Sequence, residues 1–311
     1  MQEFLITLDI MLPILLLLLF GWGLRKLGLM KEQVTSGMNQ LVFKVFLPLL
    51  IFNNIRTLDL STPPEMKLSL FMALSIFSIF LLARLVTPHF VPDVRKSGVI
   101  VQAIFRTNFA ILGIPLMLSM FGQEGMVSFS LAMPIVVPLF NVLAVIALSG
   151  TGGKVSVKQL LVKIVTNPLI IAVFTGLVFL FVKIPLPKAI DNVASQLANL
   201  TSPVSLLVLG ASLRWEGVKS NRKELFFTIL IRQLFLPCTM IFIATMLGFR
   251  GISLGVLIIL FGAPIAVSSY PMAVGMGGDK DLAAGILVLS TVTSMGTLFL
   301  LIYVSKLLAF I

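Results

Sequence analysis

Residues 105–116 read FRTNFAILGIPL and decide the fold. They lie inside a hydrophobic run long enough to cross a bilayer, yet they carry an arginine, an asparagine and a Gly-Ile-Pro break. A simple membrane anchor needs none of these features. A stretch of the same character, FGAPIAVSSYP at 261–271, follows about 150 residues later. We therefore expect two broken helices that build a binding site in the middle of a membrane.

The composition around these stretches is that of a polytopic membrane protein. The chain has 311 residues, of which 58% are hydrophobic and 11% charged, and its mean hydropathy is +1.11. A soluble domain carries about a quarter charged residues. The net charge of +11 comes from short basic clusters between apolar runs. This pattern follows the positive-inside rule, so we expect no nucleic-acid partner.

Several function classes are disfavoured by the residue inventory. The single cysteine, Cys238, excludes a disulfide framework and a cysteine-based zinc site. His89 is the only histidine, and there is no HExxH motif, no GxSxG motif and no pair of intramembrane aspartates. We therefore expect neither an enzyme nor a cofactor. The acidic N-terminus, with Glu3 and Asp9, does not resemble a cleavable signal peptide, so the first apolar run is expected to be a true span.

Apolar runs divide the chain into ten expected membrane spans. Connections with odd numbers carry 14 lysines and arginines, and the other connections and termini carry six. This bias predicts cytoplasmic odd connections and extracytoplasmic termini. The spans are expected at about 4–28, 35–55, 68–90, 98–121, 126–148, 160–182, 189–213, 224–247, 252–276 and 282–309.

The two halves resemble each other in the order of their breaks. LPL at 47–49 corresponds to SPV at 202–204, and GIP at 113–115 corresponds to GAP at 262–264. Five spans followed by five spans make the second half enter the membrane from the opposite side. We therefore expect an inverted repeat, with the first unit at 1–149, a cytoplasmic linker at 150–159 that contains GTGGK, and the second unit at 160–311.

The breaks predict a site for an anion. Proline lacks an N–H and clashes with the preceding turn, so a half-helix is expected to begin near Pro115 and near Pro264. The positive ends of such half-helices attract anions. No Asp or Glu lies deep in any expected span, which favours an anionic substrate. The candidate substrate-binding residues are Arg106, Thr107, Asn108, Gly113, Ile114, Pro115, Ala263, Pro264, Ser268, Ser269 and Tyr270.

Structural alternatives stay open for each of these residues. The prolines could be simple kinks, and Asn108 could hydrogen-bond a neighbouring helix without any ligand. Arg106 either faces the cavity, where it could bind a carboxylate with two parallel bonds, or lies near a span end and reaches the surface. The other two embedded cations, Lys44 and Arg232, are expected to be structural or to reach the membrane surface rather than to bind a ligand.

The motifs resemble those of the auxin efflux carrier family, which includes plant PIN-type carriers and bacterial malonate and malate permeases. RTNF at 106–109, GIPL at 113–116 and FG at 121–122 are similar to its fourth span. GAP at 262–264 with Ala273, NPL at 167–169 and GASL at 210–213 are similar to its bacterial members. The resemblance covers essentially the whole chain. Thr107 stands where plant carriers have proline, so a small carboxylate is expected rather than auxin.

This resemblance implies an all-α fold of the bile-acid-transporter and PIN type, with broken spans four and nine crossing. It implies a scaffold from spans 1, 2, 6 and 7, a moving transport domain from the remaining spans, elevator-type alternating access and a homodimer. The expected protein is a secondary transporter of a small organic anion such as malonate or malate in a bacterial cytoplasmic membrane, driven by a proton or by the membrane potential.

Two other functions stay open. One is a sodium-coupled organic anion symporter of the bile-acid-transporter type, with sodium held by oxygens of Ser268, Ser269, Thr293 and Gln102. The other is a nonenzymatic receptor, which a transport assay would distinguish.

Overall fold

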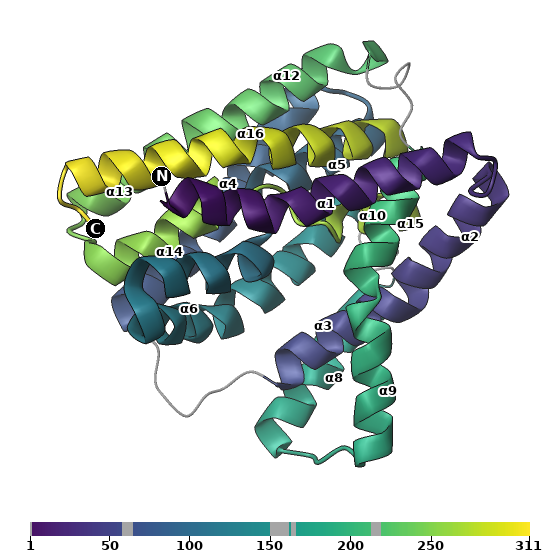
Figure 1. Cartoon of the computed structure of the whole chain (residues 1–311), viewed down its shortest axis with the longest axis horizontal. Helices are drawn as coiled ribbons and strands as arrows, with labels where there is room; N and C mark the ends of the chain where they lie inside the picture. Colours follow the sequence, from purple (N-terminus) through teal and green to yellow (C-terminus); the bar gives the residue numbers. More distant parts are fainter. Residues whose placement is uncertain (1, 58–64, 150–161, 163–165, 213–218) are drawn as a thin grey trace.

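The computed structural model describes the chain except for residues 1, 58–64, 150–161, 163–165 and 213–218, and except for the side chains of 2–11, 14–15, 110–112 and 114–115. The expected linker at 150–159 lies outside the described residues. All the secondary-structure elements in the described part are helical (Figure 1). The expectation of an all-α fold is therefore confirmed for this part of the chain.

The described helices divide between the two halves of the chain. The first half contains α1 (Gln2–Lys26), α2 (Glu32–Leu41), the π-helix η1 (Val42–Phe46), α3 (Leu47–Arg56), α4 (Met66–Phe90), α5 (Val94–Phe105) and α6 (Phe109–Ser149). The second half contains α8 (Pro168–Val182), α9 (Lys188–Asn199), α10 (Thr201–Ser212), α12 (Arg222–Leu230), the π-helix η2 (Ile231–Phe235), α13 (Leu236–Met246), α14 (Gly251–Gly262), α15 (Ser269–Gly275) and α16 (Lys280–Leu307).

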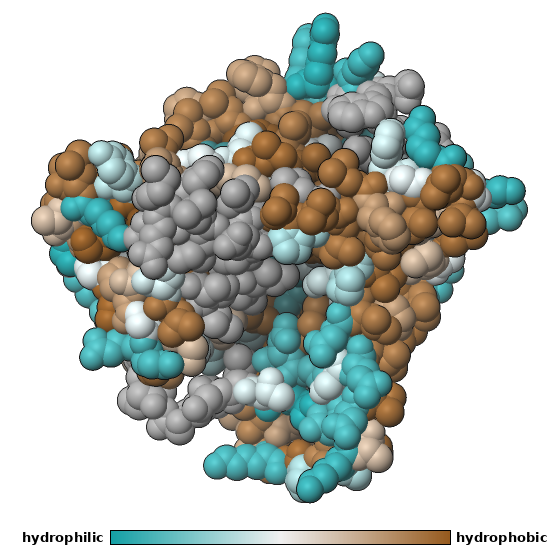
Figure 2. Space-filling model, viewed as in Figure 1, coloured by the Kyte–Doolittle hydropathy of each residue, from teal (hydrophilic) through white to brown (hydrophobic). Residues whose placement is uncertain are grey.

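Six of the described helical segments are long and apolar enough to cross a membrane. Two shorter apolar helices, α8 and α14, accompany them. Figure 2 shows hydrophobic residues over much of one face, with hydrophilic residues gathered toward its lower part and projecting at its margins. The prediction of a polytopic membrane protein is therefore confirmed. The six segments are Glu32–Arg56, Met66–Phe90, Leu116–Ser149, Lys188–Ser212, Arg222–Met246 and Lys280–Leu307.

Glycines bring α1 and α10 into backbone contact. A Cβ atom on Gly210 would lie 2.0 Å from the carbonyl oxygen of Leu18, and one on Gly21 would lie 2.2 Å from that of Leu207. Membrane helices use such small residues to gain dispersion contacts, because lipid removes the hydrophobic driving force between helices. Helix α3 packs on α8 and α9, and these three helices project together from the rest of the molecule in Figure 1.

The two π-helices have a common local cause. Each is followed directly by Leu-Pro, at Leu47-Pro48 and at Leu236-Pro237. Because proline has no N–H and crowds the preceding turn, the helix widens ahead of it. In η2, Pro237 has no N–H to donate to the carbonyl of Gln233, four residues earlier. That carbonyl accepts a hydrogen bond from the Thr297 hydroxyl, at 3.0 Å. The π-helices thus follow from the sequence, although their side-chain environments differ.

The first break does not lie where its proline predicted. Helix α5 ends at Phe105 and α6 begins at Phe109, so the break is at 106–108, and Pro115 lies within α6. The expected half-helix start near Pro115 is therefore wrong. The backbone N–H of Asn108 donates to the carbonyl of Pro264 instead of to its own helix, and this tertiary bond holds the chain open here. The second break, between Gly262 and Ser269, contains Pro264 as predicted.

Spans four and five are two helices that meet at Gly122, close to the expected boundary between 121 and 126, and a single-residue turn stands where a short connection was expected. Helix α6 runs from Phe109 to Ser149, and Gly122 is non-helical within it, with φ 62° and ψ −148°. This backbone conformation is open almost only to glycine, so one residue replaces the connection. Helix α8, in the expected sixth span, begins at Pro168, and residues 160–161 and 163–165 of that span lie outside the described residues. There Asn167 caps the helix by accepting the Leu169 N–H at 2.9 Å.

Candidate functional site

The two breaks meet in the structure. The N–H of Asn108, in the first break, donates to the carbonyl of Pro264, in the second, at 2.7 Å. Both residues are buried, and the stretches that contain them are more than 150 residues apart in sequence. The expectation that the two interrupted segments come together is therefore confirmed at this contact.

The backbone groups freed at the second break are satisfied by the protein itself. The guanidinium of Arg232 donates to the carbonyls of Phe261, at 2.6 Å, and Ala263, at 2.7 Å. The N–H of Ile265 donates to the hydroxyl of Ser290 at 3.3 Å. A helix end leaves its last carbonyls unpaired and partially negative, so a buried cation is stabilised there. Arg232 is 0% exposed, which agrees with a structural role and excludes contact with the membrane surface.

Arg106 is buried beside the crossover rather than extended to the surface. Its side chain is 4% exposed, and its Nη2 donates to Asn141 Oδ1 and to Ser268 Oγ, both at 2.9 Å. Its Nη1 contacts the sulfur of Met272. These partners are neutral, so they orient the guanidinium without cancelling its charge. A full positive charge therefore lies between α5 and the second break.

Three polar side chains in or next to the two breaks have a buried atom without a hydrogen-bond partner among the described residues. They are Thr107 Oγ1, Asn108 Nδ2 and Ser269 Oγ. A buried donor or acceptor left unpaired costs about 1–3 kcal/mol, so such groups are normally satisfied by protein, water or a ligand. They belong to the two breaks that the Asn108–Pro264 hydrogen bond joins, so the crossover has the capacity to hydrogen-bond a small polar solute.

The remaining predicted site residues whose side chains are described provide backbone carbonyls or allow close packing. Ala263 and Pro264 are buried and take part through their carbonyls. A Cβ atom on Gly113 would lie 1.8 Å from Phe129 Cζ, so this glycine lets the two parts of α6 pack together. The side chains of Ile114 and Pro115 lie outside the described residues.

A polar cavity of about 190 Å³ reaches Tyr270 from the side of α2 and α10. Ser212 of α10 lines the cavity together with Tyr270. Lys280 Nζ lies 3.2 Å from Glu32 Oε1 at the same cavity, and Arg25 adds a second cation. The cavity therefore has more positive than negative side chains. Its polar lining consists of Arg25, Glu32, Thr35, Ser36, Asn39, Ser212, Tyr270 and Lys280.

The oxygen groups expected for a sodium site are gathered only in part. Ser268 and Ser269 lie at the second break, and Gln102 is buried near the crossover, with its Nε2 3.9 Å from Met272 Sδ. Thr293 is exposed on α16, and its hydroxyl donates to the carbonyl of Leu289 at 2.8 Å. Thr293 therefore does not join the other three.

The structure adds residues that the sequence interpretation did not place in the site. Asn141 and Met272 hold Arg106, and Arg25 and Asn39 line the polar cavity. Asn141 could have been suspected, because it is a polar residue in an otherwise apolar span. Its pairing with Arg106 could not, because the two residues come from different helices.

Comparisons with known proteins give a consistent result. A family described as membrane transport protein matches residues 6–302. An uncharacterized transporter of Methanothermobacter thermautotrophicus is 24% identical over 291 residues, covering 93% of this chain and 95% of the relative. An uncharacterized transporter of Methanocaldococcus jannaschii is 26% identical over 302 residues, covering 93% and 96%. The similarity thus extends over nearly the full length of all three proteins.

Proposed function

The chain belongs to the membrane transport protein family, and on that premise we propose that it is a secondary active transporter of a small organic anion, a mono- or dicarboxylate such as malonate or malate. Family membership agrees with the resemblance to auxin efflux carriers that the motifs indicated. It also favours transport over catalysis. The anion, the site and the mechanism are the proposed part.

One observation carries the proposal: the two breaks that meet at Asn108 and Pro264 contribute buried polar atoms without a partner among the described residues, on Thr107, Asn108 and Ser269. Beside them lies the buried guanidinium of Arg106, held by neutral partners. A carboxylate would accept hydrogen bonds from the amide and hydroxyl groups and would gain from the nearby positive charge. We propose that Asn108 binds the substrate directly. Arg106 then acts mainly as a fixed charge, because its Nη2 already donates to two side chains.

The size of the polar cavity favours a small substrate. Its volume of about 190 Å³ lies below the roughly 300–1,000 Å³ that is typical of pockets for drug-sized ligands. Malonate and malate are small, whereas a bile acid or auxin is bulkier. The excess of cations, Arg25 and Lys280 against Glu32, favours an anion there as well. We propose that this cavity gives the substrate access to the crossover through Tyr270.

The proposed mechanism is elevator-type alternating access across ten spans. In this assignment, each half of the chain contains five spans in an inverted repeat, and the broken fourth span of each half is α5 with the start of α6, or α14 with α15. The packing of α1 on α10, and of α3 on α8 and α9, supports a separate scaffold. The remaining helices would form the transport domain. The assignment also implies a cytoplasmic membrane location with extracytoplasmic termini, and a homodimer, which light scattering in detergent tests.

We propose that transport does not depend on sodium. The Ser268 hydroxyl already accepts a bond from Arg106, and Thr293 is exposed and donates to the carbonyl of Leu289 in its own helix. The Arg106 guanidinium therefore already uses the Ser268 oxygen that a sodium ion would need as a ligand. Uptake that requires sodium and fails in potassium would instead support the sodium-coupled alternative, whereas dependence on a proton gradient or on the membrane potential would support the proposal.

Transport by the purified protein in liposomes tests the function directly. We expect uptake of labelled malonate or malate, and thermal stabilisation by the same acids in detergent. Asn108→Ala should weaken binding about 10- to 100-fold, because a hydrogen bond to a charged ligand contributes about 1.5–3 kcal/mol. The matched control is Asn199→Ala, at an exposed position near the end of α9, which should bind normally.

Two results would contradict the proposal. If a broad set of mono- and dicarboxylates gave neither uptake nor thermal stabilisation, the substrate would not be an organic anion. If Asn108→Ala bound the acid as tightly as the wild type, the crossover would not be the binding site.

A further inference from the structure

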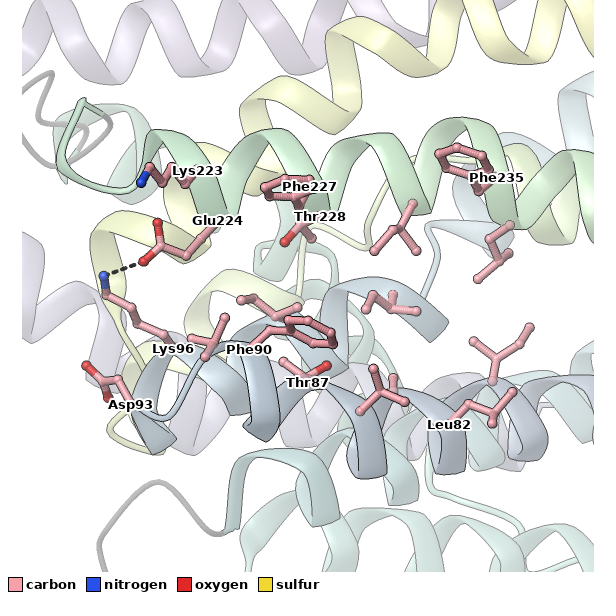
Figure 3. A pocket seen from close by; sticks show the side chains of 18 of the residues that line it. Leu82, Thr87, Phe90, Asp93, Lys96, Lys223, Glu224, Phe227, Thr228 and Phe235 are labelled. Carbon is pink, nitrogen blue, oxygen red and sulfur yellow. Dashed lines mark hydrogen bonds and ion pairs between the residues drawn. The ribbon is translucent and has the colours of Figure 1, made fainter.

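A long apolar groove lies on the outer surface between α4 and the continuous helix α12–η2–α13. Its volume is about 980 Å³, and Figure 3 shows its side chains from close by. The walls are hydrophobic and exposed: Leu82 is 61% exposed, Phe90 82% and Phe227 58%. The floor is buried and includes Ile104 of α5 and Thr228 of α12. The groove is thus open sideways, toward the medium that surrounds the helices.

One end of the groove is charged. Asp93, Lys96, Lys223 and Glu224 gather there, whereas Leu82 and Phe235 mark the opposite, apolar end (Figure 3). Lys96 Nζ lies 2.9 Å from Glu224 Oε1, and the other two charges flank this ion pair. The end therefore offers two positive and two negative groups in a small space.

The depth of the groove corresponds to one membrane leaflet. Its lining residues on α4 run from Ile79 to Phe90, which is about 17 Å at roughly 1.5 Å per residue. The hydrocarbon core of a bilayer is about 30 Å thick, so one leaflet is about 15 Å. The groove thus has a charged end and an apolar part about as long as one leaflet is thick. A membrane lipid, with its polar head group and hydrocarbon chains, has the same arrangement and length.

We propose that this groove binds a phospholipid with a zwitterionic head group of the phosphatidylethanolamine type. The hydrocarbon chain lies against Leu82, Phe90 and Phe227. The phosphate meets the lysine ammonium groups, and the lipid ammonium meets the carboxylates of Asp93 and Glu224. Because Lys96 and Glu224 already pair with each other, a purely anionic head group would bring no cation to Asp93, and a purely cationic one would bring no anion to Lys223.

The position of the groove connects it to the crossover, so the bound lipid has a consequence beyond the proposed transport function. Its floor is α5, which ends at Phe105, directly before Arg106. Its wall includes η2, which carries Arg232, the residue that caps the end of α14. A lipid in the groove therefore braces both helices that hold the buried cations. Its loss should lower the thermal stability of the protein.

Native mass spectrometry after exchange into an equal mixture of phosphatidylethanolamine and phosphatidylglycerol tests the groove. We expect the wild type to retain phosphatidylethanolamine preferentially. Val86→Trp places a large ring in the groove and should reduce retention about tenfold. Leu85→Trp is the matched control, because Leu85 is the adjacent exposed residue of α4 and does not line the groove, so retention should be unchanged.

The head-group contacts have their own variants. Asp93→Asn keeps the helix cap that Asp93 provides to the N–H of Arg95 and removes only the charge. We expect it to reduce the preference for phosphatidylethanolamine over phosphatidylglycerol, and Lys223→Gln to reduce retention of both lipids. Lys219→Gln, at an exposed site outside the groove, is the control.

Three outcomes would overturn the proposal. The first is equal retention by the Val86→Trp and Leu85→Trp proteins. The second is equal retention of the two lipids by the wild type. The third is a change of oligomeric state in Val86→Trp without lipid loss, which would assign the groove to a second copy of the chain.

Discussion

Arg232→Met removes the cation that caps the end of α14 and is the most direct test of how the crossover is held. The variant leaves the carbonyls of Phe261 and Ala263 buried without their donors. Each unpaired group costs about 1–3 kcal/mol. Relief of the buried charge offsets part of this cost, so we expect a net loss of about 2–4 kcal/mol. Methionine is apolar and of similar length, so the void it leaves is small.

The loss is measured as a fall in the midpoint of thermal unfolding in detergent, followed by the helical circular dichroism signal. At about 2–4 °C per kcal/mol for a chain of this size, the midpoint should fall by about 4–16 °C. Arg232→Lys keeps the charge but has no planar fork to reach both carbonyls, so it should lose less. Its midpoint should lie between those of the wild type and Arg232→Met.

Lys44→Met is the matched control. Lys44 lies in η1, which also precedes Leu-Pro, but its side chain is exposed. We expect its midpoint to equal that of the wild type. If Arg232→Met also unfolded at the wild-type temperature, the bonds to the two carbonyls would not hold the second break. If Lys44→Met fell as far as Arg232→Met, the effect would belong to the π-helices in general.

Three further predictions concern the packing and the site. Gly210→Ala should lower the unfolding midpoint, with a cost of about 1–3 kcal/mol, because its Cβ atom meets backbone; Gly23→Ala, with open space around it, should not. Gly122→Ala should cost about 1–3 kcal/mol because its φ of 62° and ψ of −148° strain an L-residue, and an unchanged midpoint would refute the strain. Asn141→Ala should weaken carboxylate binding severalfold by releasing Arg106, whereas unchanged affinity in a titration would mean that this contact does not position the charge.

Much of the fold could be predicted because membrane constraints act on local sequence. A run of apolar residues must become a helix in lipid, since its backbone groups have no other partner. Helix caps also depend on local sequence, as at Asn167-Pro168, where α8 begins. The first break was misplaced because Pro115 is accommodated inside α6, whereas the chain opens at a bond between Asn108 and Pro264. A tertiary hydrogen bond of this kind leaves no periodic signal.

The sequence predicted where in the chain the candidate site lies, but not what each of its residues does. Asn108 and Ser269 were expected from their polarity in apolar runs, and both have unpartnered buried atoms. Gly113 was expected to contact substrate, yet it packs against Phe129. The sequence cannot show whether a glycine near a break contacts a ligand or a neighbouring aromatic ring. Only the tertiary structure shows which group lies against it, here Phe129.

By itself, the sequence determined that this protein is a helical membrane protein with two interrupted segments and three embedded cations. Only the tertiary structure decided what those cations do. Lys44 is exposed, Arg106 is held by neutral side chains beside the crossover, and Arg232 caps a helix end. The physical reason is that the cost of a buried charge depends on which dipoles surround it. Those dipoles come from helices far away in the chain, and folding alone brings them together.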